Sequence, residues 1–153
     1  ARKTVVQPRL TSDSSVVARV VALADLLDAG MDPDGFVRAG KTLFLEENLD
    51  VYDILNRMEL ASENPTYIAS CKDRLLAWLG FQSLFAEGRR ACFEGEVAAF
   101  SSEAQKSLTH LTGYQTSLDT FLVSADAARA EYVRIGLLMP TQAIESLNAY
   151  KIT

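Results

Sequence analysis

Two groups of basic residues are the strongest candidates for binding chemistry in this sequence. Arg89 and Arg90 are adjacent, and Cys92 and Phe93 follow them closely. A guanidinium group pairs with a carboxylate through two hydrogen bonds, so two arginines beside apolar residues are suited to docking an acidic partner. The predicted partner-binding residues are therefore these two arginines and three basic residues near the N-terminus, Arg2, Lys3 and Arg9. Ordinary surface arginines and a solvated chain end are the competing interpretations.

Residue types that serve in catalysis are present, but no recognised pattern joins them. Cys71 or Cys92 would need a neighbouring base to act as a nucleophile, and His110 is the only imidazole in the chain. A di-iron site in a helical bundle needs two Glu-x-x-His motifs, whereas Ser107 stands three residues before the histidine. The sequence therefore predicts no catalytic site, no metal site and no cofactor, and it predicts that the protein is not an enzyme.

Residues 31–35 offer two aspartates near a glycine, a combination that also occurs in calcium-binding loops. The segment lacks the further ligands and the closing glutamate of such a loop. Its composition instead favours a turn.

The composition is typical of one folded domain. The chain has 153 residues, of which 48% are hydrophobic and 23% are charged, enough to bury a substantial core. A net charge of −5 disfavours nucleic-acid binding, which requires a basic surface. The longest apolar runs, such as residues 75–81, are too short to span a bilayer. We therefore expect one domain that neither binds nucleic acid nor crosses a membrane.

The central element should be a helix that begins with the N-cap Asn64 and with Pro65 in the first turn. Gln82 is the one polar residue in its apolar stripe. Three glycines weaken the later part of this segment, so we expect the helix to end at about Glu87 and a second piece to continue to Phe100. The apolar residues of the stripe are Ile68, Cys71, Leu75, Trp78 and Phe85.

The two cysteines pose a geometric question. On one continuous helix Cys71 and Cys92 would be ~30 Å apart, far beyond the reach of a disulfide. A bridge requires the chain to fold back near Gly80 or Gly88. Two buried thiols and a disulfide both remain open interpretations.

The rest of the chain is also predicted to be helical. No segment shows sustained apolar–polar alternation, so the expected fold is all-α, an up-down four-helix bundle with short extra helices. An extended N-terminal arm should cover residues 1–12, and a single helical domain should cover residues 13–153. The additional helices are expected over residues 13–29, 36–46, 48–61, 102–132 and 141–150.

The longest of these helices should begin at a capping box, in which Ser102 is followed three residues later by Gln105. Phe121 should thicken its apolar face. The predicted face consists of Ala104, Leu108, Leu111, Gln115, Leu118, Leu122 and Ala125.

Several stretches resemble the PsbQ-type extrinsic proteins of photosystem II, which include related luminal four-helix subunits of algae. Residues 106–112, 117–119 and 130–132 are spaced as in the last two helices of that family, and residues 49–55 resemble its early helix after a proline-containing arm. The resemblance implies a four-helix bundle with a structural role. It further implies a peripheral subunit in the thylakoid lumen that docks on the membrane core and shields the oxygen-evolving site.

The leading functional hypothesis is a non-catalytic structural subunit that docks onto a larger complex, a photosynthetic membrane complex if the resemblance holds. The alternative is a ligand- or cofactor-binding helical sensory domain. Its pocket would lie between helices near Trp78, Phe85 and Cys92.

Overall fold

The computed structural model describes residues 28–104 and 113–151, and its elements are all helices. No strand occurs within these ranges, which confirms the prediction of an all-α protein for the described part of the chain. The α-helices are α2 (Pro33–Glu47), α3 (Leu49–Leu55), α4 (Pro65–Ala104), α5 (Tyr114–Leu137) and α6 (Pro140–Glu145). The 3-10 helices are η1 (Asp28–Gly30), η2 (Met58–Glu63) and η3 (Ser146–Tyr150).

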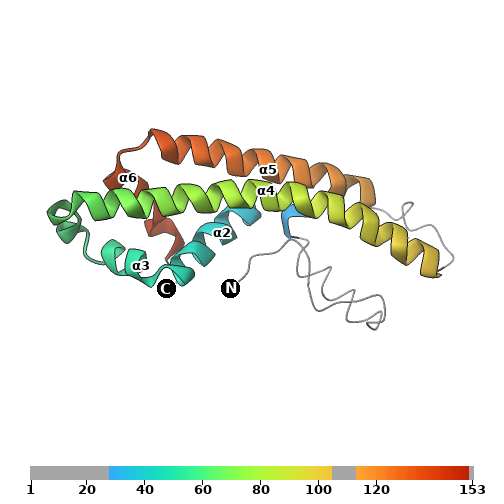
Figure 1. Cartoon of the computed structure of the whole chain (residues 1–153), viewed down its shortest axis with the longest axis horizontal. Coiled ribbons are helices and arrows are strands. Elements are labelled where there is room, and N and C mark those ends of the chain that lie inside the picture. Colours follow the sequence, from blue (N-terminus) through green and yellow to red (C-terminus); the bar gives the residue numbers. More distant parts are fainter. Residues whose placement is uncertain (1–27, 105–112, 152–153) are drawn as a thin grey trace.

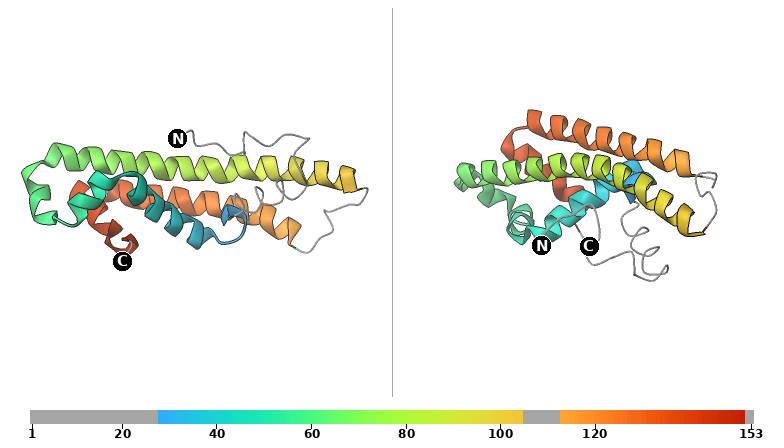
Figure 2. Two further views of the ribbon diagram at one scale, coloured as in Figure 1. Left: turned by 90° about the horizontal axis from the view of Figure 1, so that it is seen from below. Right: turned by 45° about the vertical axis from the view of Figure 1, so that its right-hand side comes forward.

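Helix α4 is the central rod of the molecule (Figure 1). Helix α5 runs antiparallel beside it, while α2 packs against both long helices (Figures 1 and 2). Helices α3 and α6 lie at the end of the molecule where α4 begins. The expected arm and most of the expected helix over residues 13–29 lie outside the described residues, so the four-helix arrangement remains a prediction.

The expected break in the central helix is wrong. Helix α4 continues for 40 residues, or ~60 Å, through Gly80, Gly88 and Gly95. A helical glycine costs only about 1 kcal/mol relative to alanine, and packing along α5 and α2 outweighs that preference. Both cysteines therefore lie on one helix, and both thiols are free. Cys71 is buried and Cys92 is half-buried, so the structure favours thiols over a bridge.

The predicted start of the long C-terminal helix is also wrong. Ser102 lies inside α4, and α5 begins only after Gly113. Gly113 has φ +96°, a left-handed conformation that favours glycine, and directly precedes α5.

Two helices begin or end at residues other than those expected. The segment expected to be a turn starts α2, because Asp32 caps this helix by accepting a hydrogen bond from the Gly35 amide (3.0 Å). The single helix expected over residues 48–61 is divided into α3 and η2. Asn48 does not cap α3 with its side chain and instead donates to the Phe44 carbonyl (2.7 Å) at the end of α2.

The core lies where α2, α3, α6 and η3 meet the first half of α4. The predicted stripe of α4 is confirmed there, because its residues from Ile68 to Trp78 are buried. On α5 the predicted face is confirmed at Leu118, Phe121 and Ala125, which are buried, whereas Leu122 is 45% exposed. The buried residues of this core are Phe44, Leu45, Val51, Leu55, Ile68, Cys71, Leu75, Trp78, Leu79, Ile135, Ala143, Ile144 and Leu147.

Two lysines bind the carbonyl groups at helix ends that are distant in sequence. Lys72 of α4 donates to the carbonyls of Gly136 (2.8 Å) and Leu138 (2.7 Å) at the end of α5. Lys151 donates to the Leu55 carbonyl (3.0 Å) at the end of α3. These carbonyls have no partner within their helices, so the ammonium groups satisfy them and fix where each helix ends.

Candidate functional site

The predicted docking arginines do not form a common surface. Arg89 is fully buried, and its guanidinium donates to both carboxylate oxygens of Glu96 (3.1 and 2.9 Å). Arg90 is half-buried and pairs with Glu94 at 3.3 Å. Consecutive residues on an α-helix point ~100° apart, so adjacency in the sequence did not place them together. The structure thus corrects the expectation for Arg89.

The other predicted docking residues, Arg2, Lys3 and Arg9, lie outside the described residues. Their role stays a prediction.

Aromatic rings contact one another where the alternative hypothesis expects a pocket. The ring centroids of Trp78 and Phe81 are 6.1 Å apart, and those of Phe81 and Phe85 are 6.0 Å apart. Phe44 and Phe36 extend this row at its two ends. A cavity lined by described residues lies elsewhere.

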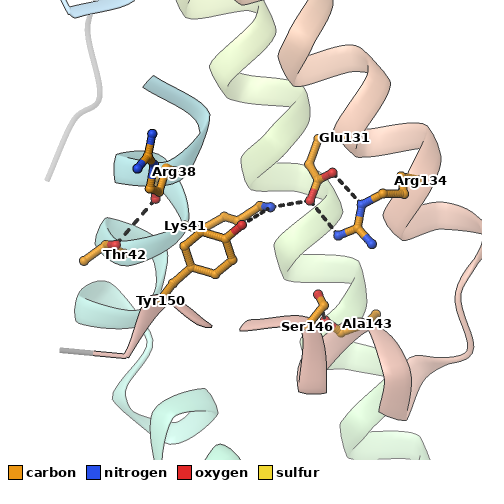
Figure 3. Close-up of polar contacts among 8 residues, drawn as sticks. All are labelled: Arg38, Lys41, Thr42, Glu131, Arg134, Ala143, Ser146 and Tyr150. Carbon is orange, nitrogen blue, oxygen red and sulfur yellow. Dashed lines mark hydrogen bonds and ion pairs between the residues drawn. The ribbon is translucent and has the colours of Figure 1, made fainter. Parts of the chain in front are cut away.

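That cavity lies between α2, α5 and η3 and has a volume of about 480 Å³. We call it the α2–α5 pocket, and Figure 3 shows its polar side. Five of its residues carry charge, and small apolar residues complete its wall. The pocket is lined by Asp34, Val37, Arg38, Lys41, Ala127, Ala130, Glu131, Arg134 and Tyr150.

Lys41 forms the floor of the α2–α5 pocket. Its side chain is 5% exposed, and its ammonium group forms an ion pair with Glu131. The same Nζ atom donates to the Tyr150 hydroxyl (3.1 Å) and lies 4.5 Å from the centroid of that ring. A lysine is rarely buried without such partners, because removing its charge from water is costly. The contacts join α2, α5 and η3 at one point.

Glu131 is held in its charged form. Burial alone would raise its pKa, but hydrogen bonds from Arg134 and Lys41 outweigh burial and lower the pKa below its usual value. Arg134 donates to Glu131 through Nε (2.6 Å) and Nη2 (2.8 Å), which raises the pKa of the guanidinium. A carboxylate fixed in this way is poorly suited to exchanging protons near neutral pH. The arrangement favours binding over acid–base chemistry.

The sequence did not predict that these residues form a pocket. Lys41 and Tyr150 are separated by 109 positions, and neither belongs to a motif. The one available signal was the position of Lys41 on a short predicted helix, directly after glycine and apolar residues. Such a position is ordinary in sequence, so only the fold identifies the cluster.

A second ionic cluster joins α3 to α4 at the surface. Arg74 donates to both oxygens of Asp50 (2.6 and 3.2 Å), and the Tyr67 hydroxyl donates to the same carboxylate (2.5 Å). The hydrogen bond from Arg74 is the main cause that lowers the pKa of Asp50 to about 2. The hydrogen bond to Asp50 raises the pKa of Tyr67 to about 12. This cluster fastens two helices.

The side of α5 that points away from α4 exposes large apolar residues. Leu122 and Val123 are 45% and 54% exposed near the start of the helix, while Val133 and Leu137 are 59% and 84% exposed near its end. We call these four residues the α5 outer face. In Figure 1 α5 forms one edge of the molecule, and no other described element covers this side. Exposed large apolar side chains that share one side of a helix are typical of an interaction surface.

Two properties of residues 28–104 and 113–151 bear on function. They contain no group of three or more histidine, cysteine, aspartate or glutamate side chains placed to hold a metal ion. None of their helices is long and apolar enough to cross a membrane.

Comparison of the chain with protein-family models, with curated protein sequences and with solved structures gave no match.

Proposed function

We propose that this protein is a non-catalytic structural subunit that docks onto a larger protein complex through the α5 outer face. The observation that carries the proposal is the exposure of four large apolar side chains on one side of a single helix. Full burial of such a side chain contributes about 1.5–3 kcal/mol, so four of them can supply much of the energy of a specific contact. The costs of association reduce this sum.

The shape and charge of the α5 outer face favour a particular partner surface. From Leu122 to Leu137 the face extends ~22 Å along the helix, which suits an apolar helix of the partner. Asp119 and Asp126 are exposed on the same side, while the nearby Arg129 is paired with Asp126 and with Glu87. The excess of negative charge predicts basic residues beside the apolar strip of the partner.

The resemblance to PsbQ-type proteins gives the proposal its finer content. It suggests that the complex is photosystem II, that the protein resides in the thylakoid lumen, and that the segment over residues 13–29 completes a four-helix bundle. The coincidence of α3 (Leu49–Leu55) with one of the resembling stretches supports this part. We further propose that Arg2, Lys3, Arg9 and Arg90 add contacts to acidic parts of the complex.

The test is a binding assay of the full-length protein on photosystem II membranes that have been washed with salt to remove their extrinsic proteins. Val133→Glu and Leu137→Glu each place a charge on the α5 outer face, and we expect each to weaken binding at least about tenfold. Leu49→Glu is the matched control, because Leu49 is 69% exposed on α3 and receives the same change. Circular dichroism checks that all three variants keep their helices.

The outcomes separate the parts of the proposal. Equal binding of the wild type and both α5 variants would reject the docking face. Failure of the wild type to bind would reject photosystem II as the complex. Unchanged binding after deletion of residues 1–12 would reject the contribution of the arm.

A further inference from the structure

We propose that the α2–α5 pocket is a binding site for a small organic carboxylate with an apolar body. The pocket shares α5 with the α5 outer face but is lined by other residues of that helix, and the inference does not depend on the docking role.

The hydrogen-bond donors at the floor of the pocket outnumber the acceptors. Lys41 has three N–H groups and uses two of them, one on Glu131 and one on the Tyr150 oxygen. The Tyr150 hydroxyl accepts from Lys41, and its own hydrogen has no acceptor among the described residues. Arg134 binds Glu131 through Nε and Nη2, which leaves Nη1 without an acceptor in the same part of the chain. Three groups, the Lys41 ammonium, the Tyr150 hydroxyl and the Arg134 guanidinium, therefore keep hydrogen-bond donors for a ligand.

The carboxylate at the floor of the pocket, Glu131, already accepts hydrogen bonds from both cations. Oε1 of Glu131 accepts from Lys41 and from Arg134 (2.8 Å), and Oε2 accepts from Arg134 (2.6 Å). Figure 3 shows both cations converging on this one group. The Tyr150 hydroxyl donates neither to Glu131 nor to another described residue, so its acceptor must come from water or from a bound molecule.

The net charge at the floor of the pocket also favours a carboxylate ligand. Lys41 and Arg134 contribute two positive charges and Glu131 contributes one negative charge, which leaves an excess of one positive charge. Asp34 and Arg38 also line the pocket and cancel each other. A single negative charge would neutralise the floor, which matches one carboxylate better than a phosphate dianion. The excess is local, because the whole chain carries a net charge of −5.

The walls of the pocket indicate the rest of the ligand. Val37, Ala127 and Ala130 contribute apolar surface, and the two alanines leave space between α2 and α5 that a larger side chain would occupy. The volume of about 480 Å³ is in the range of small-molecule sites. The expected ligand therefore places its carboxylate on Lys41 and Tyr150 and its apolar body against these walls.

The test is isothermal titration of the full-length protein with sodium acetate, butyrate and benzoate, and with sodium phosphate at matched ionic strength. We expect saturable binding that strengthens from acetate to benzoate, because the apolar body gains contacts with the wall. Tyr150→Phe keeps the ring and removes the donor, so binding should weaken about tenfold. Tyr132→Phe is the matched control, since Tyr132 is exposed outside the pocket and undergoes the same change.

Three results would overturn the inference. The first is the absence of saturable binding of all three carboxylates to the wild type. The second is equal binding by the Tyr150→Phe and Tyr132→Phe variants. The third is tighter binding of phosphate than of benzoate, which would contradict the assignment of a carboxylate. A melting temperature that rises with benzoate in the wild type and not in Tyr150→Phe provides an independent readout.

Discussion

The side-chain amide of Gln82 occupies the space that a Cβ atom on Gly40 would need. A Cβ built on Gly40 would lie 1.7 Å from Nε2 of Gln82, far inside contact distance. Because Gly40 lacks that atom, Gln82 reaches α2 from α4 and donates to the Phe36 carbonyl (3.1 Å). Gln82, the one polar residue in the stripe of α4, therefore contacts α2 in the space that Gly40 leaves open.

The contact between Gly40 and Gln82 predicts that the effect of Gly40→Ala on stability changes sign when Gln82 is replaced by alanine. Gly40→Ala should destabilise the wild type by about 1–2 kcal/mol, because the Gln82 amide must move and lose its hydrogen bond. In a Gln82→Ala background the space is empty, and Gly40→Ala should stabilise the protein by up to about 1 kcal/mol through helix propensity. Urea denaturation of the four proteins measures both effects. The same sign in both backgrounds would show that the two residues are not coupled.

The continuity of α4 leads to a prediction about two other glycines. Gly95 is exposed inside this helix, and a Cβ added there would meet nothing within 4 Å. Gly95→Ala should therefore stabilise the protein by about 0.5–1 kcal/mol. Gly113→Ala should destabilise it by about 1 kcal/mol, because φ +96° is strained for alanine. Denaturant midpoints test both, and destabilisation by Gly95→Ala would indicate that α4 bends there.

Lys72 should contribute to stability although it lies near the surface. Lys72→Met removes the donor to the carbonyls of Gly136 and Leu138, and we expect a loss of about 1 kcal/mol because water replaces part of each bond. Arg38→Met is the control, since this exposed side chain makes no ion pair within the described part of the chain and should change stability by less than about 0.5 kcal/mol. Equal effects in thermal unfolding would argue against the bridging role of Lys72.

The Asp50 cluster predicts a dependence of stability on acid pH. The folded-state pKa of Asp50 is about 2, below its ordinary value of 3.8, so the folded state favours the charged form. Its contribution should be fully present above about pH 4 and should disappear as the pH falls through about 2. Urea midpoints of the wild type and Asp50→Asn should converge over that interval. A constant difference between the wild type and Asp50→Asn over that interval would contradict the cluster.

Patterns that lie within one helix were predictable from the sequence. The stripe of α4 from Ile68 to Trp78 is buried as expected, because a spacing of three and four residues alone places those side chains on one face. The continuity of α4 at Gly88 was not predictable in the same way, since the cost of one glycine is small and neighbouring helices decide the outcome. Local sequence patterns thus predict that a helix forms, whereas packing against neighbouring helices decides how long it is.

The α2–α5 pocket depends on contacts between distant parts of the chain. Lys41, Glu131 and Tyr150 come from three elements, and no spacing rule connects them. Arg89 illustrates the opposite error, because a conspicuous residue in a basic pair became a buried partner of Glu96. A charged residue acquires its role from the charges that the fold brings to it, so sequence neighbours were a poor guide for both.

Because α4 is one continuous helix, it holds residues along its length at fixed distances from one another. Cys71 and Cys92 sit on this one rod, so spectroscopic labels on them would keep a constant separation of ~30 Å as long as the rod stays straight. Oxidants cannot join these two sulfur atoms without unwinding the helix between them. Any disulfide that this protein forms from them must therefore link it to another molecule.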